Sequence, residues 1–559
     1  MPPNTSIARF ARPLAWIVLV AAAVFGAGYW WLLGRPVNLP DSPTAKIACV
    51  SYAPFRFQGE TPFDPTAFIP PERIDADLKA LSARFDCVRT YSMGQGLGAV
   101  PDIAGRYGMK VLMGIWLGRD PVANDREIAL GLAAAKRDHD TLRGIVVGNE
   151  VLLRGELSEK QLAGYIKRVN DATDVPVTYA DVWEFWQRHP ALAKVTDYLT
   201  IHILPYWEDQ PVAPERAVAH VADVYRKMKG EFPGRQIMIG ETGWPSEGRT
   251  RRDASASLVN EARYIREFLN YAATVDMPYN VIEAFDQPWK RDLEGTVGGY
   301  WGIFDADAKP KFAMQGPIVE EPRWTWGLGA GVVGALGFLV VGTVRRSWRG
   351  TAGQGALVLA GFASGTALAA HARLLTFACR NHAEWAAGIA IGVLGLLTAL
   401  SLSRSIAAGL AAPTGAATDQ AATASVRPAV GARRLAGIAW SDVFTPQRFF
   451  WMFVVTLYGI LLAFNGRYRD FPIGLFALPC IGFLLLALAR TPVTRELPLV
   501  EERLLALSMT VLAVAVVIEE LGANAVSWGW LLLNLSLALP VLFAWWQRRT
   551  AREPAEASR

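Results

Sequence analysis

The chain has 559 residues, of which 52% are apolar, and carries a formal net charge of +5 with a mean hydropathy of +0.20. This length is too great for one ordinary hydrophobic core, so two or more structural units are expected. The basic residues form no patch with interleaved aromatics, which gives little support to nucleic-acid binding. The four cysteines form no Cys-x-x-Cys pair and no cluster with histidine, so neither a structural metal nor another cofactor is expected.

The chain begins with an apolar run over residues 16–33 that follows Arg9 and Arg12. A secretory signal peptide is one interpretation. The run is long for one, however, and its far end carries Tyr29, Trp30 and Trp31 rather than small residues. Interfacial aromatics are typical of a retained span. We therefore predict that residues 1–35 are a cytoplasmic N-terminus and a signal-anchor transmembrane helix.

Residues 36–322 have the charge and aromatic content of a soluble enzyme, and short β-rich runs alternate there with amphipathic stretches. Eight strands with intervening helices predict a (β/α)8 TIM barrel. A doubly wound sheet is the alternative, but it would want a Gly-rich phosphate loop after the first strand, which 51–54 does not provide. The expected strands are 47–52, 87–91, 110–116, 144–149, 177–180, 198–203, 236–241 and 281–285; the expected helices are 73–84, 126–138, 158–172, 214–229 and 255–274.

Cys49 and Cys87 fall in neighbouring predicted strands. They could form a disulfide in an oxidising compartment. Two buried thiols are favoured here, because free cysteine is among the most buried residue types.

After Pro322 the chain is dominated by apolar runs, most of them near the ~20 residues that cross a bilayer. We predict an all-α membrane domain of about seven helices over 323–546, with a flexible loop near 405–447 and a cytoplasmic tail at 547–559. The runs are 324–344, 353–372, 384–402, 449–465, 471–489, 503–521 and 525–546.

Arginines give these spans a direction. With eight spans in all, the groups at 9–12, 345–349, 404–448, 490–495 and 548–552 fall on one side, which marks that side as cytoplasmic. A minority falls on the other side: Arg373, Arg380, Arg467 and Arg469. Residues 36–322 are therefore expected on the periplasmic face of the inner membrane.

Polar and aromatic residues follow the C-terminal ends of the predicted strands, where a barrel of this kind carries its chemistry. Glu150 follows the fourth strand and Glu241 ends the seventh, so the two can face each other across a cleft. One carboxyl group can protonate a glycosidic oxygen while the other stabilises or attacks the sugar cation, and a separation of about 5 Å gives retention. The residues alone do not assign the two roles.

Other residues at these strand ends are candidate sugar contacts. Asn149 can bond a sugar 2-hydroxyl. His202 is equally a core histidine, and Arg89 is either a contact or a structural residue that orders the carboxylates by charge-assisted bonds. The aromatic residues are either flat faces for pyranose rings or packing residues. The candidate substrate-binding set is Tyr52, Arg89, Tyr91, Asn149, His202, Tyr206, Trp244, Asp286, Gln287 and Trp289.

Five segments carry a resemblance to glycoside hydrolase family 17, the β-1,3-glucanases and glucanosyltransferases. They are 88–91 (VRTY), 147–150 (VGNE), 240–246 (GETGWPS), 283–286 (EAFD) and 299–305 (GYWGIFD). The resemblance covers about 45–315 and implies a retaining mechanism with Glu150 as acid/base and Glu241 as nucleophile. Gln287 departs from it, because fungal relatives often have an acid there.

Proteobacterial members of the family with membrane spans at both ends look linked to the synthesis of periplasmic or exported β-glucans, including β-1,6 linkages. The resemblance thus implies a membrane-bound enzyme that hydrolyses or transfers β-1,3-glucan through a glucosyl-enzyme, in contact with membrane lipid and downstream of a separate glucan synthase. A catalytically inactive glucan-binding sensor or transport partner is the alternative. A synthase is disfavoured, because no sizeable cytoplasmic domain is present to bind a nucleotide sugar.

Overall fold

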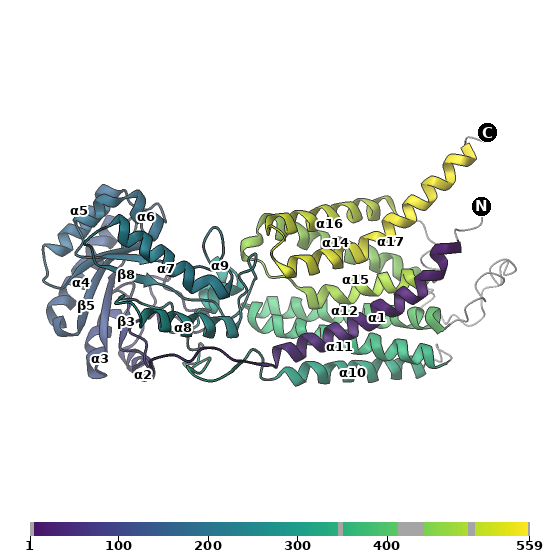
Figure 1. Ribbon diagram of the computed structural model, residues 1–559, viewed down its shortest axis with the longest axis horizontal. Coiled ribbons are helices and arrows are strands. Elements are labelled where there is room, and N and C mark those ends of the chain that lie inside the picture. Colours follow the sequence, from purple (N-terminus) through teal and green to yellow (C-terminus); the bar gives the residue numbers. More distant parts are fainter. Residues whose placement is uncertain (1–4, 345–349, 412–440, 490–497, 557–559) are drawn as a thin grey trace. The chain divides into compact units, whose positions relative to one another are not determined.

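The computed structural model describes residues 5–344, 350–411, 441–489 and 498–556 (Figure 1). The chain divides into two compact units, Pro36–Ile318 and a second unit made of Met1–Arg35 with Val319–Arg559. The arginine groups expected at 345–349, 427–434 and 490–495, and the centre of the predicted loop, lie outside the described residues.

The first unit is a parallel barrel, which confirms the predicted fold class. Its seven strands lie in one sheet in chain order (Figure 1). They are β2 (Val50–Ser51), β3 (Cys87–Arg89), β4 (Lys110–Ile115), β5 (Leu142–Asn149), β6 (Val177–Val182), β7 (Leu199–His202) and β8 (Ile237–Glu241). A separate two-stranded sheet pairs β1 (Pro36–Val37) with β9 (Ile318–Val319).

The predicted eighth strand closes the sheet without forming a continuous ladder. Tyr279 bridges Ile239 of β8, and Val281 bridges Val50 of β2. The amides along this segment alternate between partners, since Val281 bonds the Cys49 carbonyl and the next residue bonds the Thr242 carbonyl. The segment therefore joins both edges of the sheet while remaining irregular.

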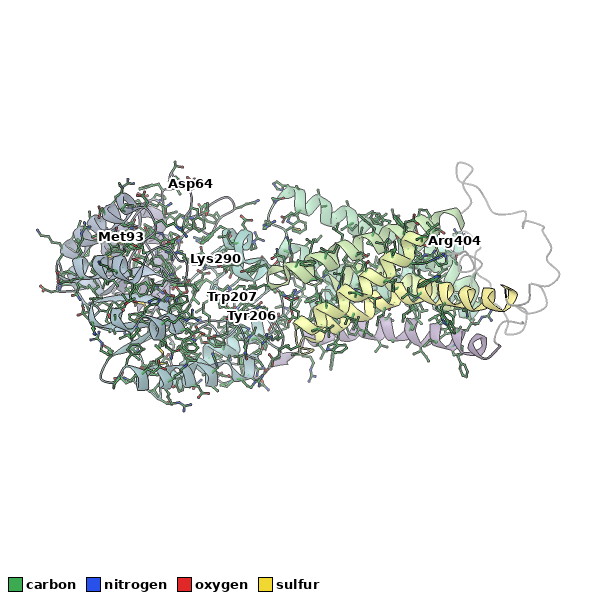
Figure 2. All side chains as sticks on the ribbon, turned by 90° about the horizontal axis from the view of Figure 1, so that it is seen from above. Asp64, Met93, Tyr206, Trp207, Lys290 and Arg404 are labelled. Carbon is green, nitrogen blue, oxygen red and sulfur yellow. A yellow bond between two sulfur atoms is a disulfide. The ribbon has the colours of Figure 1, made fainter. Side chains whose placement is uncertain are left out.

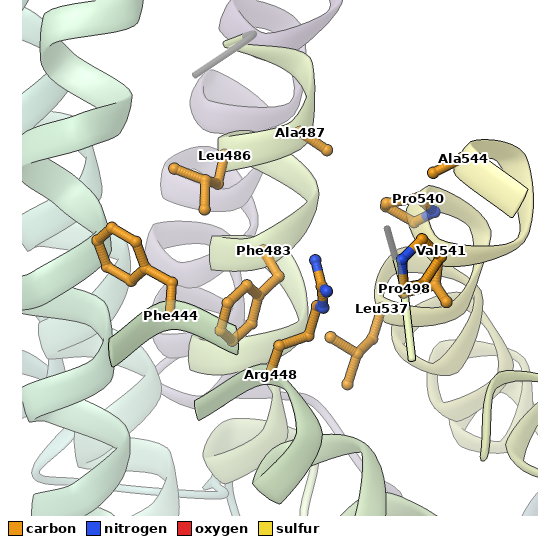
Figure 3. Close-up of a pocket in the computed structure, with 10 residues that line it drawn as sticks. All are labelled: Phe444, Arg448, Phe483, Leu486, Ala487, Pro498, Leu537, Pro540, Val541 and Ala544. Atoms are coloured by element: carbon orange, nitrogen blue, oxygen red, sulfur yellow. The ribbon is translucent and has the colours of Figure 1, made fainter. Parts of the chain in front are cut away.

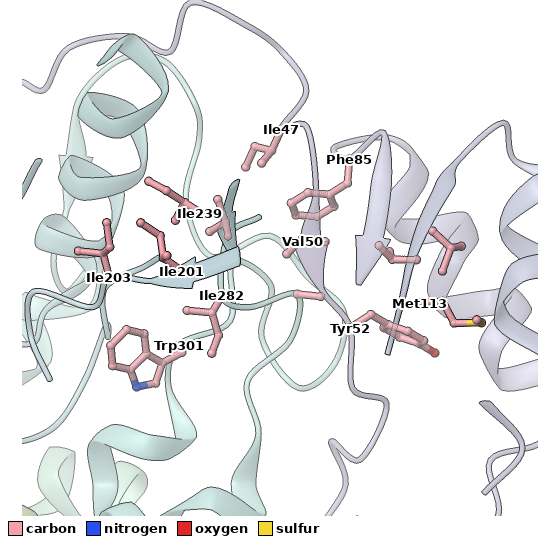
Figure 4. Packing of buried hydrophobic residues seen from close by; sticks show 14 of the residues in the cluster. Ile47, Val50, Tyr52, Phe85, Met113, Ile201, Ile203, Ile239, Ile282 and Trp301 are labelled. Carbon is pink, nitrogen blue, oxygen red and sulfur yellow. The ribbon is translucent and has the colours of Figure 1, made fainter. Parts of the chain in front are cut away.

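The helices of this unit pack on the outside of the sheet and bury their apolar faces in its main hydrophobic core (Figure 1). Figure 4 shows residues that the strands contribute to this core, including Val50, Met113 and Ile201. Local signals place their starts: Ser158 and Gln161 form a capping box before α5, and Asp120 caps α4. The short helices α3, α6 and α9 were not predicted. The set is α2 (Pro71–Ser82), α3 (Val100–Arg106), α4 (Pro121–Arg137), α5 (Glu159–Asn170), α6 (Trp183–Arg188), α7 (Pro214–Glu231), α8 (Leu258–Ala272) and α9 (Arg291–Glu294).

Cys49 and Cys87 form a disulfide, which corrects the expectation of two buried thiols. The register explains it: Val50 lies opposite Val88 in the parallel pair, so the preceding residue of each strand lies beside the other, with Cα atoms 4.3 Å apart. Both cysteines are buried in a small cluster distinct from the main core, with residues from β4, β5, β6 and β8 and with Tyr198, which directly precedes β7.

The second unit is all-helical, with a helix at each predicted apolar run (Figure 1). Among the described residues, six of these helices are long and apolar enough to cross a membrane. The other two are α15, which has 16 residues, and α16, whose first turn is acidic. The helices are α1 (Thr5–Leu33), α10 (Trp324–Val344), α11 (Thr351–Ala378), α12 (His382–Ala411), α14 (Ser441–Phe464), α15 (Ile473–Leu488), α16 (Val500–Glu519) and α17 (Ala525–Glu556).

Arg404 and Arg448, expected in the loop near 405–447, lie instead within α12 and α14. Arg448 lines a cavity of about 40 Å³ between α14, α15 and α17 (Figure 3). Its guanidinium makes two bonds, of 2.8 and 2.9 Å, to the buried carboxylate of Glu502. This pair neutralises both charges inside the helical unit.

Candidate active site

Glu150 and Glu241 meet at the C-terminal end of the barrel strands. Glu150 follows β5 directly, and Glu241 is the last residue of β8. One carboxylate oxygen of each, together with Nδ1 of His202, lie within 4.8 Å of one another. The fold thus brings together the carboxyl groups of two glutamates that are 91 residues apart in sequence and lie at the ends of different strands.

Glu241 is held by a cation and a hydroxyl. Its Oε1 accepts bonds from Arg89 Nη1 at 3.0 Å and from the Tyr91 hydroxyl at 2.8 Å. Burial alone would raise the pKa of Glu241, but the nearby His202 and Arg89 charges and the Tyr91 bond bring the pKa below its ordinary value. These contacts therefore favour the ionised form of Glu241.

Arg89 orders more than one part of the site. Besides Glu241, it donates to the Gly240 carbonyl at 2.9 Å and to Asn149 Oδ1 at 2.5 Å. The guanidinium is buried and thus spans the ends of β8 and β5 from its position on β3. The sequence allowed Arg89 to be either a sugar contact or a residue that orders the carboxylates, and its contacts favour the second interpretation.

Glu150 is the more accessible carboxyl, with 22% of its side chain exposed against 6% for Glu241. Its backbone is left-handed, with φ of 51°, and its amide donates to the Ala180 carbonyl of β6 at 2.8 Å. Oε1 of Glu150 lies 2.8 Å from His202 Nδ1. An accessible carboxyl beside a buried one gives the pair two different environments, as an acid and a nucleophile require.

His202 lies between the glutamates, with Nδ1 3.7 Å from Glu241 Oε2 as well. We place a proton on Nδ1, because this nitrogen faces Glu241, whose ionised carboxylate can only accept. The ring is buried, and Nε2 has no hydrogen-bond partner among the described residues. His202 is therefore a buried residue that faces both carboxyl groups with one nitrogen.

The segment after the eighth strand position adds a charged network. Lys290, labelled in Figure 2, bonds both oxygens of Glu283 at 2.7 and 2.8 Å. Burial raises the pKa of Glu283 to about 7, although Lys290 opposes the shift. Asp286 bonds Lys311 at 3.0 Å, and burial likewise raises its pKa to about 6. The predicted contact Asp286 is thus engaged with protein groups.

Four of the predicted aromatic and amide contacts are packed in the core, the alternative that the sequence left open. All four are fully buried. Their polar atoms bond within the protein: Tyr52 to Asp77, Tyr206 to the Arg249 carbonyl, Trp244 to the Ser255 carbonyl and Gln287 to the Ala53 carbonyl.

Trp289 remains partly exposed. Its indole nitrogen donates to Gln287 Oε1, and its ring lies nearly perpendicular to that of Phe63, with the ring centroids 5.4 Å apart. Phe63 is 63% exposed. These two rings offer an apolar face beside Lys290 that a sugar can stack on.

Sequence reasoning missed Tyr179 and Asp181 on β6, which lie beside the Glu150 turn. Asp181 is fully buried and accepts from the Val182 amide at 2.8 Å and from the Tyr179 hydroxyl. Burial raises the pKa of Asp181 to about 6, and the Glu150 charge adds to this. The signal available was a polar residue in an otherwise apolar strand, YADV at 179–182.

The carboxylates of Glu150 and Glu241 with His202 are also the groups that could hold a cation. The Arg89 guanidinium, 3.0 Å from Glu241, already supplies a positive charge there. The donor set therefore fits an acid–base site better than a metal centre.

Comparison with known proteins places these residues in context. Residues 49–302 match the family model of the BtgE/BtgC glycoside hydrolase domain. A glucan 1,3-beta-glucosidase of Arthroderma benhamiae is 28% identical over 255 residues, 43% of this chain and 82% of its own, and one of Saccharomyces cerevisiae is 23% identical over 270 residues, 43% and 84%. A solved β-1,3-glucanosyltransferase of Rhizomucor miehei aligns with a TM-score of 0.43 and 24% identity over 49% of this chain and 98% of its own.

Proposed function

We propose that this chain, whose residues 49–302 match the BtgE/BtgC glycoside hydrolase domain, is a membrane-bound retaining enzyme that remodels β-1,3-glucan. The observation that carries the proposal is the pairing of Glu150 and Glu241, with carboxylate oxygens within 4.8 Å. Retaining glycosidases hold their carboxyl groups at about 5–5.5 Å, whereas inverting enzymes leave room for a water between them at about 6.5–9.5 Å. The glucan substrate follows from the relatives, several of which are glucan 1,3-beta-glucosidases.

In the proposed first step, Glu241 attacks the anomeric carbon. The glycosidic bond breaks, and Glu150 gives its proton to the departing sugar oxygen. Arg89 and Tyr91 keep Glu241 ionised before attack. The products are a glucosyl ester on Glu241 and a shortened glucan.

In the second step, Glu150 removes a proton from the acceptor, whose oxygen displaces Glu241 from the sugar. Water as the acceptor gives hydrolysis, and a glucan hydroxyl gives transfer and a new linkage. Glu150 has the accessibility that this exchange of leaving group and acceptor requires. The same ester serves both outcomes, so the enzyme branches or elongates glucan wherever acceptor sugars outcompete water.

The test is trapping of the ester. A 2-deoxy-2-fluoro laminaribioside with a dinitrophenyl leaving group should label a single peptide containing Glu241, and mass and linkage analysis with laminari-oligosaccharides should show shorter and longer products. Glu241→Gln should abolish both. Unchanged activity in Glu241→Gln would refute the proposal, and tight glucan binding with no turnover in the wild type would favour the sensor.

We also propose that the barrel is periplasmic and that the helical unit spans the inner membrane. Six helices with the length and apolarity of spans support this, as does the Cys49–Cys87 disulfide, since such bonds persist in oxidising compartments. Exposed aromatics at helix ends fit interfacial belts, with Trp31 at the end of α1 and Trp326 at the start of α10. In this setting the acceptor comes from a separate glucan synthase.

A topology test is direct. Alkaline phosphatase fused at the C-terminus should be inactive and green fluorescent protein there should fluoresce, because both report a cytoplasmic end. Protease added to spheroplasts should cut within residues 36–318 under unfolding conditions. An active C-terminal phosphatase would overturn the orientation.

A further inference from the structure

Glu150 lies in a backbone conformation that its residue type rarely adopts. Its φ is 51°, and Gly148 two residues earlier has a φ of 84°. A non-glycine residue in the left-handed region persists only where the surroundings over-determine it. The contacts around this turn therefore decide where the Glu150 carboxyl points.

A hydrogen-bonded chain on β6 supports this turn. The Leu152 amide, two residues after Glu150, donates to the Tyr179 hydroxyl at 3.1 Å. That hydroxyl donates in turn to Asp181 Oδ2, whose other oxygen accepts from the Val182 amide at 2.8 Å. The Tyr179 hydroxyl can accept from Leu152 only while its own proton is directed to Asp181, so the carboxylate fixes the direction of the chain.

Packing holds the same ring against the turn. The Tyr179 ring lies 5.7 Å from that of Trp186 and beside Gly148, where an added Cβ would lie 3.4 Å from the ring edge. Tyr179 is 1% exposed, and Asp181 is fully buried. Neither side chain is open to a sugar, so their polar groups act through the backbone that carries Glu150 rather than through substrate.

We propose that Tyr179 and Asp181 are positioning residues for Glu150, holding the left-handed turn that aims its carboxyl at the leaving and incoming oxygen. The inference rests on the proposed function, because it assigns Glu150 the proton transfers. It also divides the site into two halves. The hydrogen bonds of Tyr179 and Asp181 on β6 position the acid/base residue, while Arg89 and Tyr91 hold Glu241. Loss of the hydrogen bonds from Leu152 through Tyr179 to Asp181 should therefore impair proton transfer by Glu150 and leave nucleophilic attack by Glu241 intact.

The test uses Tyr179→Phe in the full chain, which keeps the ring and removes only the hydroxyl. We expect kcat on laminari-oligosaccharides, whose leaving oxygen needs a proton, to fall about tenfold or more with KM within about twofold, in the range that general acid catalysis contributes. Labelling of Glu241 by the fluorinated dinitrophenyl laminaribioside, whose leaving group needs no proton, should proceed within about twofold of the wild-type rate. Asp181→Asn should follow the same pattern, because it supplies one acceptor oxygen in place of two.

The matched control is Tyr225→Phe, which removes the hydroxyl of another buried tyrosine. Tyr225 lies on α7, and its hydroxyl donates to the Ile237 carbonyl of β8 at 3.3 Å, so it belongs to a different hydrogen bond from that of the Glu150 turn. It should leave both rates unchanged. Equal losses in oligosaccharide turnover and in labelling by Tyr179→Phe would show a general structural defect and overturn the proposal, as would wild-type turnover. Absence of turnover and labelling in the wild type would instead overturn the proposed function itself.

Discussion

Replacing Arg89 by methionine tests how the buried Glu241 is stabilised. The change keeps an unbranched apolar stem and removes the cation 3.0 Å from Glu241 Oε1, together with the bonds to the Gly240 carbonyl and Asn149. Both partners of the pair are almost fully buried, with 1% and 6% of their side chains exposed. Removing one partner of such a pair leaves an uncompensated charge and costs about 3–5 kcal/mol of folding free energy.

This loss should depend on pH. The pKa of Glu241 is lowered in the folded barrel, so the pair contributes stability above the unfolded pKa of about 4.3 and loses it as pH falls through the folded value. Without Arg89 the unpaired buried carboxylate favours protonation, and acid relieves its cost. The free-energy difference between wild type and Arg89→Met should therefore narrow from pH 7 to pH 4, until only the loss of the bonds from Arg89 to the Gly240 carbonyl and Asn149 remains.

Pulse proteolysis of the full chain in detergent and urea measures the unfolding free energy of the barrel. Glu241→Gln and the double variant complete a cycle, in which the pair should show a coupling of about 2–3 kcal/mol at pH 7. A cost for Arg89→Met below about 1 kcal/mol, or one that stays constant between pH 7 and pH 4, would show that Glu241 is not held as an anion by Arg89.

Three further outcomes are expected. Tyr91→Phe removes a hydrogen bond that lowers the pKa of Glu241, so the acid limb of the pH profile of kcat/KM should move to higher pH. A limb that does not move would show that it does not report the titration of Glu241. Trp289→Ala should lower kcat/KM for long laminari-oligosaccharides by about 5–150-fold, from a stacking loss of about 1–3 kcal/mol, and leave kcat/KM for the shortest substrates unchanged; equal effects at all lengths would contradict a sugar-binding face. Replacing both Cys49 and Cys87 by alanine frees a loop 38 residues long and should lower the unfolding free energy of the barrel by about 4 kcal/mol, whereas an unchanged value would mean the bond is absent in the native chain.

The motif positions and the barrel could be predicted because both depend on local patterns. Alternating apolar strands and amphipathic helices fix the order of elements, and the ends of parallel strands meet at one face, which brings Glu150 and Glu241 together. The orientation of an individual side chain is a different matter. Tyr52 and Trp244 lie at strand ends like Tyr91, yet both are buried, because successive residues near a strand end turn to opposite sides and a one-residue difference decides which.

The supporting contacts were beyond sequence reasoning for a related reason. The bond from the Leu152 amide to the Tyr179 hydroxyl joins the turn after β5 to β6. It exists only because β5 and β6 are neighbours in a particular register, with Asn149 opposite Ala180. The same holds for Cys49 and Cys87, whose separation is set by the β2–β3 register. Residue types give the candidates, whereas register gives the pairs.

The two points where the chain leaves and re-enters the helical unit are adjacent. The Glu321 amide donates to the Leu33 carbonyl at 2.9 Å, and Gly34 packs so closely against Trp324 that a Cβ there would lie 2.2 Å from the indole. The barrel is thus a domain inserted between α1 and α10, and hydrogen bonding and packing hold the two ends of the insertion next to each other. A short linker between α1 and α10 could therefore take the place of the barrel while leaving the contact between these helix ends, so the helical unit and the barrel can be studied as separate modules.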